Sequence, residues 1–160
     1  MELNGEVIVL DEGKVLQKGP AKEIFENPRT LKVAEISNDP PMNILRGTKS
    51  SEKLSFENVS INSPSHFKNL SDQGYNFGIR ASEIKLDDQG EEFEIELAEI
   101  SGSETLLHLK KGESKVIALI EEVMNFKIHE KVKIKFNENK LYAFDQNEEL
   151  VSSPYGVSHG

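Results

Sequence analysis

From Asn43 onward, hydrophobic residues alternate with polar residues in short runs, and this period of two constrains the fold more than any other feature. Such alternation puts apolar side chains on one face of a strand and polar side chains on the other. Turn residues separate the runs, as at 88–90, 111–112 and 137–140, and the serine-containing stretch 62–74 predicts the loosest loop. Eight or nine runs in about a hundred residues predict a mostly β barrel or sandwich.

A different pattern precedes the alternation. Two hydrophobic runs within residues 7–16 flank a short turn in which Gly13 can adopt positive φ, so this segment predicts a β-hairpin. Pro20 suits the first turn of a helix. Punctuated hydrophobic periods then predict two short helices over residues 21–26 and 31–36. The chain is therefore expected to begin with a hairpin and two short helices and to continue as a β domain.

Four segments carry a family resemblance. Residues 11–20 read Asp-Glu-Gly-Lys-Val-Leu-Gln-Lys-Gly-Pro, residues 36–45 read Ile-Ser-Asn-Asp-Pro-Pro-Met-Asn-Ile-Leu, residues 78–80 read Gly-Ile-Arg, and residues 101–106 read Ser-Gly-Ser-Glu-Thr-Leu. In this order they resemble the carboxyl-terminal part of the ATPase subunit of sugar-importing ABC transporters of the maltose and glycerol-phosphate type. The chain departs from that pattern after Gly-Ile-Arg, where Ala-Ser-Glu replaces the usual Pro-Glu, and before the first Pro of 36–45, where Asn-Asp replaces a common Gly.

The resemblance implies a domain organisation and a role. Residues 1–42 would be the end of the ATPase domain and its linker, residues 43–150 an OB-like barrel of the kind often called TOBE, and residues 151–160 a flexible tail. The implied role is regulatory and dimerising. The partners would be a second copy of the subunit, the transporter's membrane subunits through the parent protein, and a regulatory protein. The implied location is the cytoplasmic face of the membrane, as a peripheral part of a transporter complex.

The sequence lacks Gly-x-x-x-x-Gly-Lys-Ser/Thr, the motif whose backbone amides and lysine cradle phosphates. We therefore expect no catalytic residues, no metal site and no cofactor in this chain. By the resemblance, ATP and Mg²⁺ belong to the full-length parent. The chain's formal charge of -9 would repel nucleic acid and anionic lipid, so no nucleic-acid partner is expected.

The remaining composition supports the same class of protein. No apolar run is long enough to span a bilayer, and residues 1–4 lack the start of a signal peptide, so we expect neither insertion nor secretion. The absence of cysteine excludes disulfides and thiolate metal sites and fits a reducing compartment. The chain is long enough to bury roughly 70% of its unfolded surface, which suffices for one real core.

Several charged groups invite a catalytic or binding hypothesis, but a structural interpretation is preferred for each. Glutamates alternate with apolar residues over 91–99, which is typical of the wet face of a strand. The lysines of 127–135 alternate in the same way. They suit the outer face of a sheet, or an edge strand whose charges prevent aggregation. The four histidines, His66, His108, His129 and His159, lie far apart and lack metal-ligand spacing. A small hydrolase using these groups stays open as an alternative.

Three places are candidate interface or regulatory residues. Met42 and Asn43 are expected to lock the turn between subdomains through the Asn amide, in preference to binding a ligand. Arg80 is expected to pair with Glu83, three residues on, at the exit of a strand, with a contact across a subunit boundary as the alternative.

The third candidate place is the loop containing Gly102, Ser103 and Glu104. Its small, glycine-bearing sequence is like that of loops that hold oxyanions, yet it is more simply the corner between two strands. A free-standing OB-like module that binds a small oxyanion or sugar at the barrel mouth is therefore the alternative function. A concave site lined by backbone amides near residues 101–105 would favour it.

Overall fold

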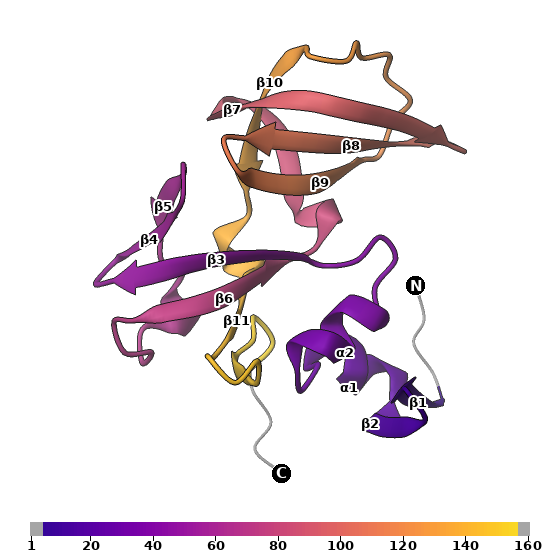
Figure 1. Cartoon of the computed structure of the whole chain (residues 1–160), viewed down its shortest axis with the longest axis vertical. Coiled ribbons are helices and arrows are strands. Elements are labelled where there is room, and N and C mark those ends of the chain that lie inside the picture. The colour runs from indigo at the N-terminus through magenta and orange to yellow at the C-terminus, as the bar shows by residue number, and fades with distance from the viewer. Residues whose placement is uncertain (1–4, 157–160) are drawn as a thin grey trace.

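Strands dominate the computed structural model, which describes residues 5–156 (Figure 1). The described part of the chain forms twelve strands in three sheets, together with two α-helices and three short 3-10 turns. The prediction of a mostly β fold with a preceding hairpin and two short helices is confirmed. Residues 1–4 and 157–160, which include the start that was compared with a signal peptide, lie outside the described residues.

The first sheet is the hairpin of β1 (Glu6–Asp11) and β2 (Lys14–Pro20). Gly13 turns the chain at φ +78°, a conformation that glycine adopts without steric cost. One face of the hairpin packs inward, with Val9 and Gln17 both buried. The opposite face leaves Ile8, Leu10 and Val15 in water at 52%, 56% and 60% exposure, whereas Val7, which shares a face with Val9, is 37% exposed.

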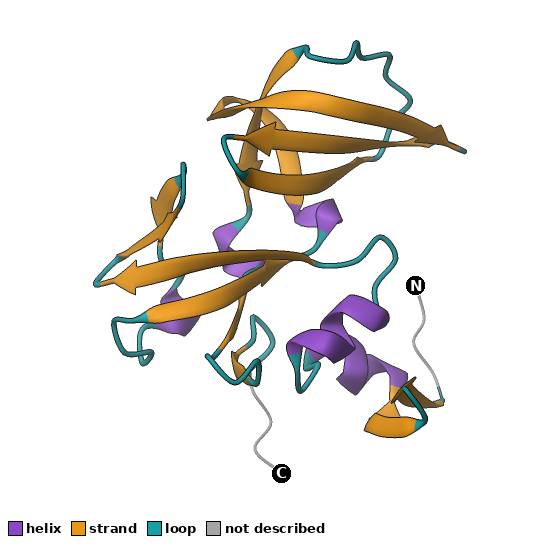
Figure 2. Cartoon of the chain, viewed as in Figure 1, coloured by secondary structure: helices purple, strands orange, loops and turns teal. Residues whose placement is uncertain are grey.

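Two short helices, α1 (Ala21–Glu26) and α2 (Leu31–Ile36), follow the hairpin. Thr30 begins α2 by accepting a hydrogen bond on its hydroxyl oxygen from a backbone N–H three residues on, at 3.2 Å. Ile24 of α1 joins buried residues of the hairpin and of α2 in a small cluster. Ala34 of α2 packs the other way, into a cluster with the β domain. The helices therefore lie beside one end of the β domain, outside its two sheets (Figure 2).

The β domain consists of a six-stranded and a four-stranded antiparallel sheet that face each other (Figure 1). The six-stranded sheet runs in the order β12-β11-β6-β3-β4-β5 and the four-stranded sheet in the order β10-β7-β8-β9. Within residues 5–156 these remain two separate sheets that do not close into a barrel. The strands are β3 (Asn43–Ser50), β4 (Lys53–Phe56), β5 (Ser60–Asn62), β6 (Gly74–Ile79), β7 (Ile84–Ser101), β8 (Glu104–Lys111), β9 (Ser114–Ile120), β10 (Lys131–Phe136), β11 (Tyr142–Phe144) and β12 (Leu150–Ser152).

The main core lies between the two sheets and takes side chains from both. Phe77 of β6 is fully buried and meets Phe56 edge-on, with ring centroids 5.5 Å apart. Ile95 and Leu107 face them from the four-stranded sheet and are also fully buried. Burial of this apolar surface is what holds the two sheets together.

The segment 62–74 is anchored at its centre, contrary to the expectation of a loose loop. Its short 3-10 turn (Ser65–Phe67) puts Phe67 into the core with no exposed surface. The neighbouring His66 places Nε2 2.7 Å from the backbone oxygen of Leu141. The serine-rich composition of this segment predicted a loose loop, but burial of the single Phe67 side chain is enough to anchor it.

The expected flexible tail, residues 151–160, is also corrected over its first part. Strand β12 continues to Ser152, which is buried together with Ser153. The hydroxyl of Ser153 donates a hydrogen bond to the backbone oxygen of Glu26 in α1 at 2.9 Å. The ring centroid of Tyr155 also lies 6.4 Å from that of Phe25, so Ser153 and Tyr155 contact α1, while 157–160 lie outside the described residues.

Candidate functional site

Asn43 connects the two sheets through its side chain. It is buried, and its Nδ2 donates a hydrogen bond to the backbone oxygen of Ile117 at 2.9 Å, while Ile117 N donates to Asn43 Oδ1 at 2.7 Å. Ile117 lies in β9, the edge strand of the four-stranded sheet. The Asn43 side-chain amide thus makes two hydrogen bonds to β9 of the kind that a neighbouring strand would make through its backbone. Its neighbour Met42 is buried over Gly78, where an added Cβ would lie 2.6 Å from the Met42 sulfur.

Arg80 has partners other than the one that the sequence predicted. The prediction of an Arg80–Glu83 pair is wrong, because the guanidinium turns toward the helical segment. Its Nε donates to Asn38 Oδ1 at 2.8 Å, its Nη1 to the Tyr142 hydroxyl at 2.7 Å, and its Nη2 to the backbone oxygen of Phe25. The guanidinium carbon also lies 3.8 Å from the centre of the Phe25 ring, within cation–π range.

Arg80 therefore fastens the helical segment to the β domain. Burial raises the pKa of the Tyr142 hydroxyl, so this group stays neutral when it accepts the bond from Arg80. The same junction contains an isolated backbone bridge between Thr30 and Glu149. Asn38 is held in turn by a bond from its Nδ2 to the backbone oxygen of Ala34 at 2.6 Å. These partners could not be predicted from spacing, since Phe25, Asn38 and Tyr142 all lie far from Arg80 in the chain.

Gly102, Ser103 and Glu104 form the turn at the tip of the β7–β8 hairpin. Gly102 has φ +59° and nothing lies within 4 Å of the position of a Cβ there. Gly102 and Ser103 are exposed, and the hairpin tip points away from the rest of the molecule (Figure 1). A protruding turn offers no enclosed set of backbone amides for an oxyanion. The structure thus places these residues at a strand corner and does not bring them near Arg80 or Asn43.

The glutamates of β7 lie beside basic groups on both neighbouring strands. Glu94 sits 2.8 Å from His129 Nδ1 and 3.2 Å from Lys131 Nζ, and these two groups lower the pKa of the Glu94 carboxyl, His129 more than Lys131. Glu91 lies 2.8 Å from Lys111 Nζ. These are solvent-facing cross-strand ion pairs, the arrangement that stabilises a sheet surface.

The histidines do not gather at a metal centre in the described part of the chain. No group of three His, Cys, Asp or Glu residues within 5–156 could hold a metal ion. His108 lies 3.4 Å from Glu99, and His159 lies outside the described residues.

A cleft of about 330 Å³ lies beside Asn43, between β3 and the edge strand β9. His108 and Lys115 line it, together with Glu96. Lys115 Nζ is 3.6 Å from Glu96 Oε1, so these two opposite charges offset each other. The cleft therefore provides no free cationic pocket for an anion.

The outer face of the four-stranded sheet carries an apolar patch toward the tip of the β7–β8 hairpin. The register places Leu97 opposite His108, and Leu106 opposite Leu119 in the next row of the same face. Leu97 is 42% exposed and the two other leucines are half-buried. We call Leu97, Leu106 and Leu119 the outer leucine patch. Apolar surface of this kind, rimmed by charged groups, is typical of protein contact sites.

Helices that could cross a membrane are absent from residues 5–156, since none is long and apolar enough.

Comparison with known proteins points to one class of relatives. The uncharacterized ABC transporter ATP-binding protein YcjV of Escherichia coli (strain UTI89 / UPEC) is 24% identical over 159 residues, which cover 94% of this chain and 44% of that protein. The sn-glycerol-3-phosphate import ATP-binding protein UgpC of the same strain is 27% identical over 151 residues, covering 91% and 42%. An uncharacterized ABC transporter ATP-binding protein of Sinorhizobium fredii (strain NBRC 101917 / NGR234) is 25% identical over 151 residues, covering 92% and 41%.

No family model matches the chain. The chain spans less than half the length of the curated relatives it matches. Over nearly all of its own length, it is similar to ATP-binding proteins of ABC transporters, one of them named for glycerol-phosphate import.

Proposed function

We propose that this chain is the regulatory and dimerisation region of the ATPase subunit of an ABC importer for sugars or sugar phosphates. The observation that carries the proposal is its similarity to ATP-binding proteins of ABC transporters over more than nine-tenths of its length. The missing phosphate-binding motif agrees with a region outside the nucleotide site. Residues 1–42 are then the end of the ATPase domain and its linker, and residues 43–150 are the TOBE-like domain.

The hairpin supports this assignment. Its outer face leaves Ile8, Leu10 and Val15 more than half exposed, although water-facing strands usually carry polar side chains there. An isolated two-stranded hairpin is marginal and needs a partner to pack on. In the proposed parent, the rest of the ATPase domain covers this face.

The Arg80 junction supports a regulatory role. Arg80 ties Asn38 and the backbone of Phe25 to the β domain, so a movement of the helical segment is passed to the sheets. The proposed partners are a second copy of the subunit, the membrane subunits of the transporter and a regulatory protein, at the cytoplasmic face of the membrane. A standing contact between two such domains holds the second subunit at high effective concentration while the nucleotide sites are apart.

Calorimetry with Mg-ATP tests whether the nucleotide site lies elsewhere. We expect no heat of specific binding, because the residues that would cradle the phosphates are missing. Micromolar affinity for Mg-ATP would overturn the assignment. A positive control is the same titration with a full-length ABC ATPase subunit.

A further inference from the structure

A cleft of about 260 Å³ opens on the side of the β domain where the two sheets do not meet. One wall is β5, the outermost strand of the six-stranded sheet. The other wall is β10 together with residues 89–91 of β7. This volume lies just below the range of about 300–1,000 Å³ that is usual for small-molecule pockets, so the cleft suits a ligand no larger than a single sugar ring.

The β5 wall presents unpaired backbone groups. Ser63 N donates to Glu52 O at 2.8 Å. These two residues continue the β4–β5 ladder by one position, so Glu52 and Ser63 form one of its hydrogen-bonded pairs. Bonded and non-bonded pairs alternate in an antiparallel ladder, so the N–H and C=O groups of Asn62 and Ser60 point away from β4. Both residues line the cleft. This wall therefore offers donors and acceptors without any side-chain rearrangement.

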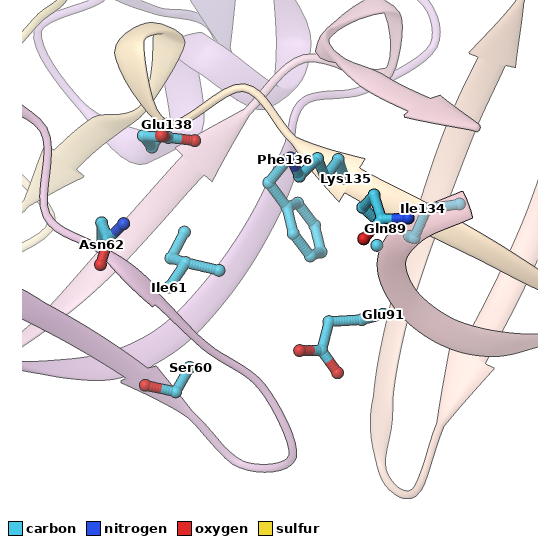
Figure 3. Close-up of a pocket in the computed structure, with 10 residues that line it drawn as sticks. Ser60, Ile61, Asn62, Gln89, Glu91, Ile134, Lys135, Phe136 and Glu138 are labelled. Carbon is cyan, nitrogen blue, oxygen red and sulfur yellow. The ribbon is translucent and has the colours of Figure 1, made fainter. Parts of the chain in front are cut away.

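The opposite wall and the rim supply polar side chains. The Gln89 backbone N–H donates to Asp87 Oδ1 at 2.8 Å, and its exposed side-chain amide points to the opening, while Glu138 adds a partly exposed carboxylate (Figure 3). Glu91 uses Oε2 for Lys111 at 2.8 Å, which leaves its other carboxylate oxygen to accept a bond. Figure 3 shows Gln89, Glu91 and Glu138 around the same opening, contributed by β7 and by the turn after β10.

The space between these polar groups has an apolar floor. Ile61 of β5 and Phe136 of β10 point toward each other across it (Figure 3). Phe136 is 5% exposed and Ile61 is partly buried, so their positions are fixed by the core below. The apolar side chains can contact the C–H groups on the face of a sugar ring, and the polar groups of the two walls can form hydrogen bonds with the hydroxyls at its edge.

The charges around the cleft decide between neutral and anionic ligands. Two carboxylates, Glu91 and Glu138, line it against one lysine, Lys135. The charge of Glu91 is also offset by Lys111 at 2.8 Å. The charges around the cleft therefore nearly balance and leave no surplus of positive charge to attract phosphate or sulfate, while the carboxylates can accept hydrogen bonds from hydroxyls. Because β5 has only three residues, it is too short an edge to add a peptide strand.

We propose that this cleft is a binding site for a neutral polyhydroxylated small molecule of the sugar or polyol class. The binding itself stands on the geometry of the cleft. Any regulatory meaning, such as a response of the transporter to its solute, rests on the proposed function. The two claims can fail separately, since the test below measures binding and does not involve self-association.

The test is a titration of the ¹⁵N-labelled chain with the single-ring sugars D-glucose and D-galactose, followed by amide chemical shifts. We expect saturable shifts at Ser60, Asn62, Gln89, Glu91 and Phe136. The anionic counter-probes sn-glycerol 3-phosphate and sulfate should give smaller shifts at these amides. The double variant Gln89→Ala/Glu138→Ala should weaken binding about tenfold or more, because two hydrogen-bonding groups are lost.

The matched control is Gln73→Ala/Glu35→Ala, two exposed residues that do not line the cleft. It should bind as the unchanged chain does. Both double variants alter surface residues and should keep their amide spectra outside the substituted sites. The proposal is overturned if both sugars leave the cleft amides unshifted at high millimolar concentration, if the shifts map elsewhere, or if the anions bind more tightly at these amides.

Discussion

Arg80 joins the helical segment to the β domain through three side-chain hydrogen bonds. Its planar guanidinium donates in three directions, to a side-chain amide, a hydroxyl and a backbone carbonyl, and also stacks on Phe25. Hydrogen bonds to charged groups contribute more than neutral ones, and a lysine cannot reproduce this fork. The motif around Arg80 thus serves a joint between two structural parts.

Arg80→Ala should lower the free energy of unfolding by about 2–4 kcal/mol, because it removes three bonds and leaves partly buried acceptors without this donor. Arg80→Lys should retain only a minority of the lost stability. Urea denaturation followed by circular dichroism measures both. Arg46→Ala is the matched control, since Arg46 is exposed, and it should change stability by no more than about 0.5 kcal/mol. An Arg80→Ala chain as stable as this control would contradict the described joint.

Asp72 makes a second prediction at the residue scale, one that concerns pH. Its Oδ1 accepts from Ser51 N at 3.0 Å and from Lys49 Nζ at 3.1 Å, and the backbone bond, then Lys49, hold the pKa of the Asp72 carboxyl below its ordinary value. A carboxyl whose folded pKa is depressed contributes stability above its unfolded pKa of about 3.9. That contribution is lost as the pH falls through the lowered folded pKa.

The measurement is the unfolding midpoint of the unchanged chain and of Asp72→Asn between neutral pH and pH 2. The variant should be less stable at neutral pH, and the difference should shrink toward zero as the pH falls below about 4. A difference that stays constant across this range would show that the Asp72 charge is not what matters.

At the scale of the element, β7 is the strand that departs most from a regular form. Its register against β10 jumps from Leu86 opposite Ile134 to Glu92 opposite Lys133, so residues 87–91 form an excursion from the ladder. Gly90 lies on this excursion, and a Cβ there would be 2.1 Å from the Ile134 backbone oxygen. The excursion also forms one wall of the cleft between the sheets.

Gly90→Ala should destabilise the chain by about 1–3 kcal/mol, because the added methyl group meets backbone that cannot move aside. Gly19→Ala is the control, since nothing lies within 4 Å of its added Cβ and its φ is not positive. That change should be neutral or slightly stabilising. Thermal unfolding compares the two variants. Equal melting temperatures would contradict the close approach at Gly90.

A strand or helix could be predicted from the sequence when the positions that face the core were apolar. The hairpin and both helices followed from turn residues and period. Strand β3 opens the alternating region but shows no clear alternation of its own, because two of its buried positions are Asn43 and Lys49, and a polar residue breaks an alternation pattern. The turn expected at residues 88–90 lies instead within the continuous β7, since a bulge uses the same residue types as a turn.

The candidate site was less predictable than the fold. The sequence singled out Arg80 and Asn43, yet the bonds they make go to residues that are distant in the chain and are therefore invisible to spacing. The cleft between β5 and β10 had no sequence signal at all, because it depends on which strands end the two sheets.

At the scale of the whole molecule, self-association is governed by charge and apolar area. The formal charge of -9 opposes the approach of two copies. The outer leucine patch supplies apolar contact on the β domain, and the hairpin supplies a second apolar surface at Ile8. The proposed dimer uses the β domain. Because repulsion between like charges is screened by salt while apolar contact is not, salt should strengthen it.

Two variants separate the surfaces. Leu97→Glu puts a charge into the outer leucine patch and should weaken self-association at least tenfold, whereas Ile8→Glu on the hairpin, at similar exposure, should leave it unchanged. Size-exclusion chromatography over a range of concentrations detects the difference. If Ile8→Glu alone weakened association, the hairpin would be the contact surface and the β domain would lose its proposed role.

Sedimentation equilibrium of the unchanged chain at several salt concentrations tests the proposed dimerisation role most directly. We expect a weak dimer whose dissociation constant falls as ionic strength rises from low to moderate, because screening reduces the repulsion between two copies that each carry -9. A strict monomer at every concentration would contradict a dimerising role for this chain. A dimer that dissociates as salt is added would show that opposite charges, and not apolar contact, hold it together.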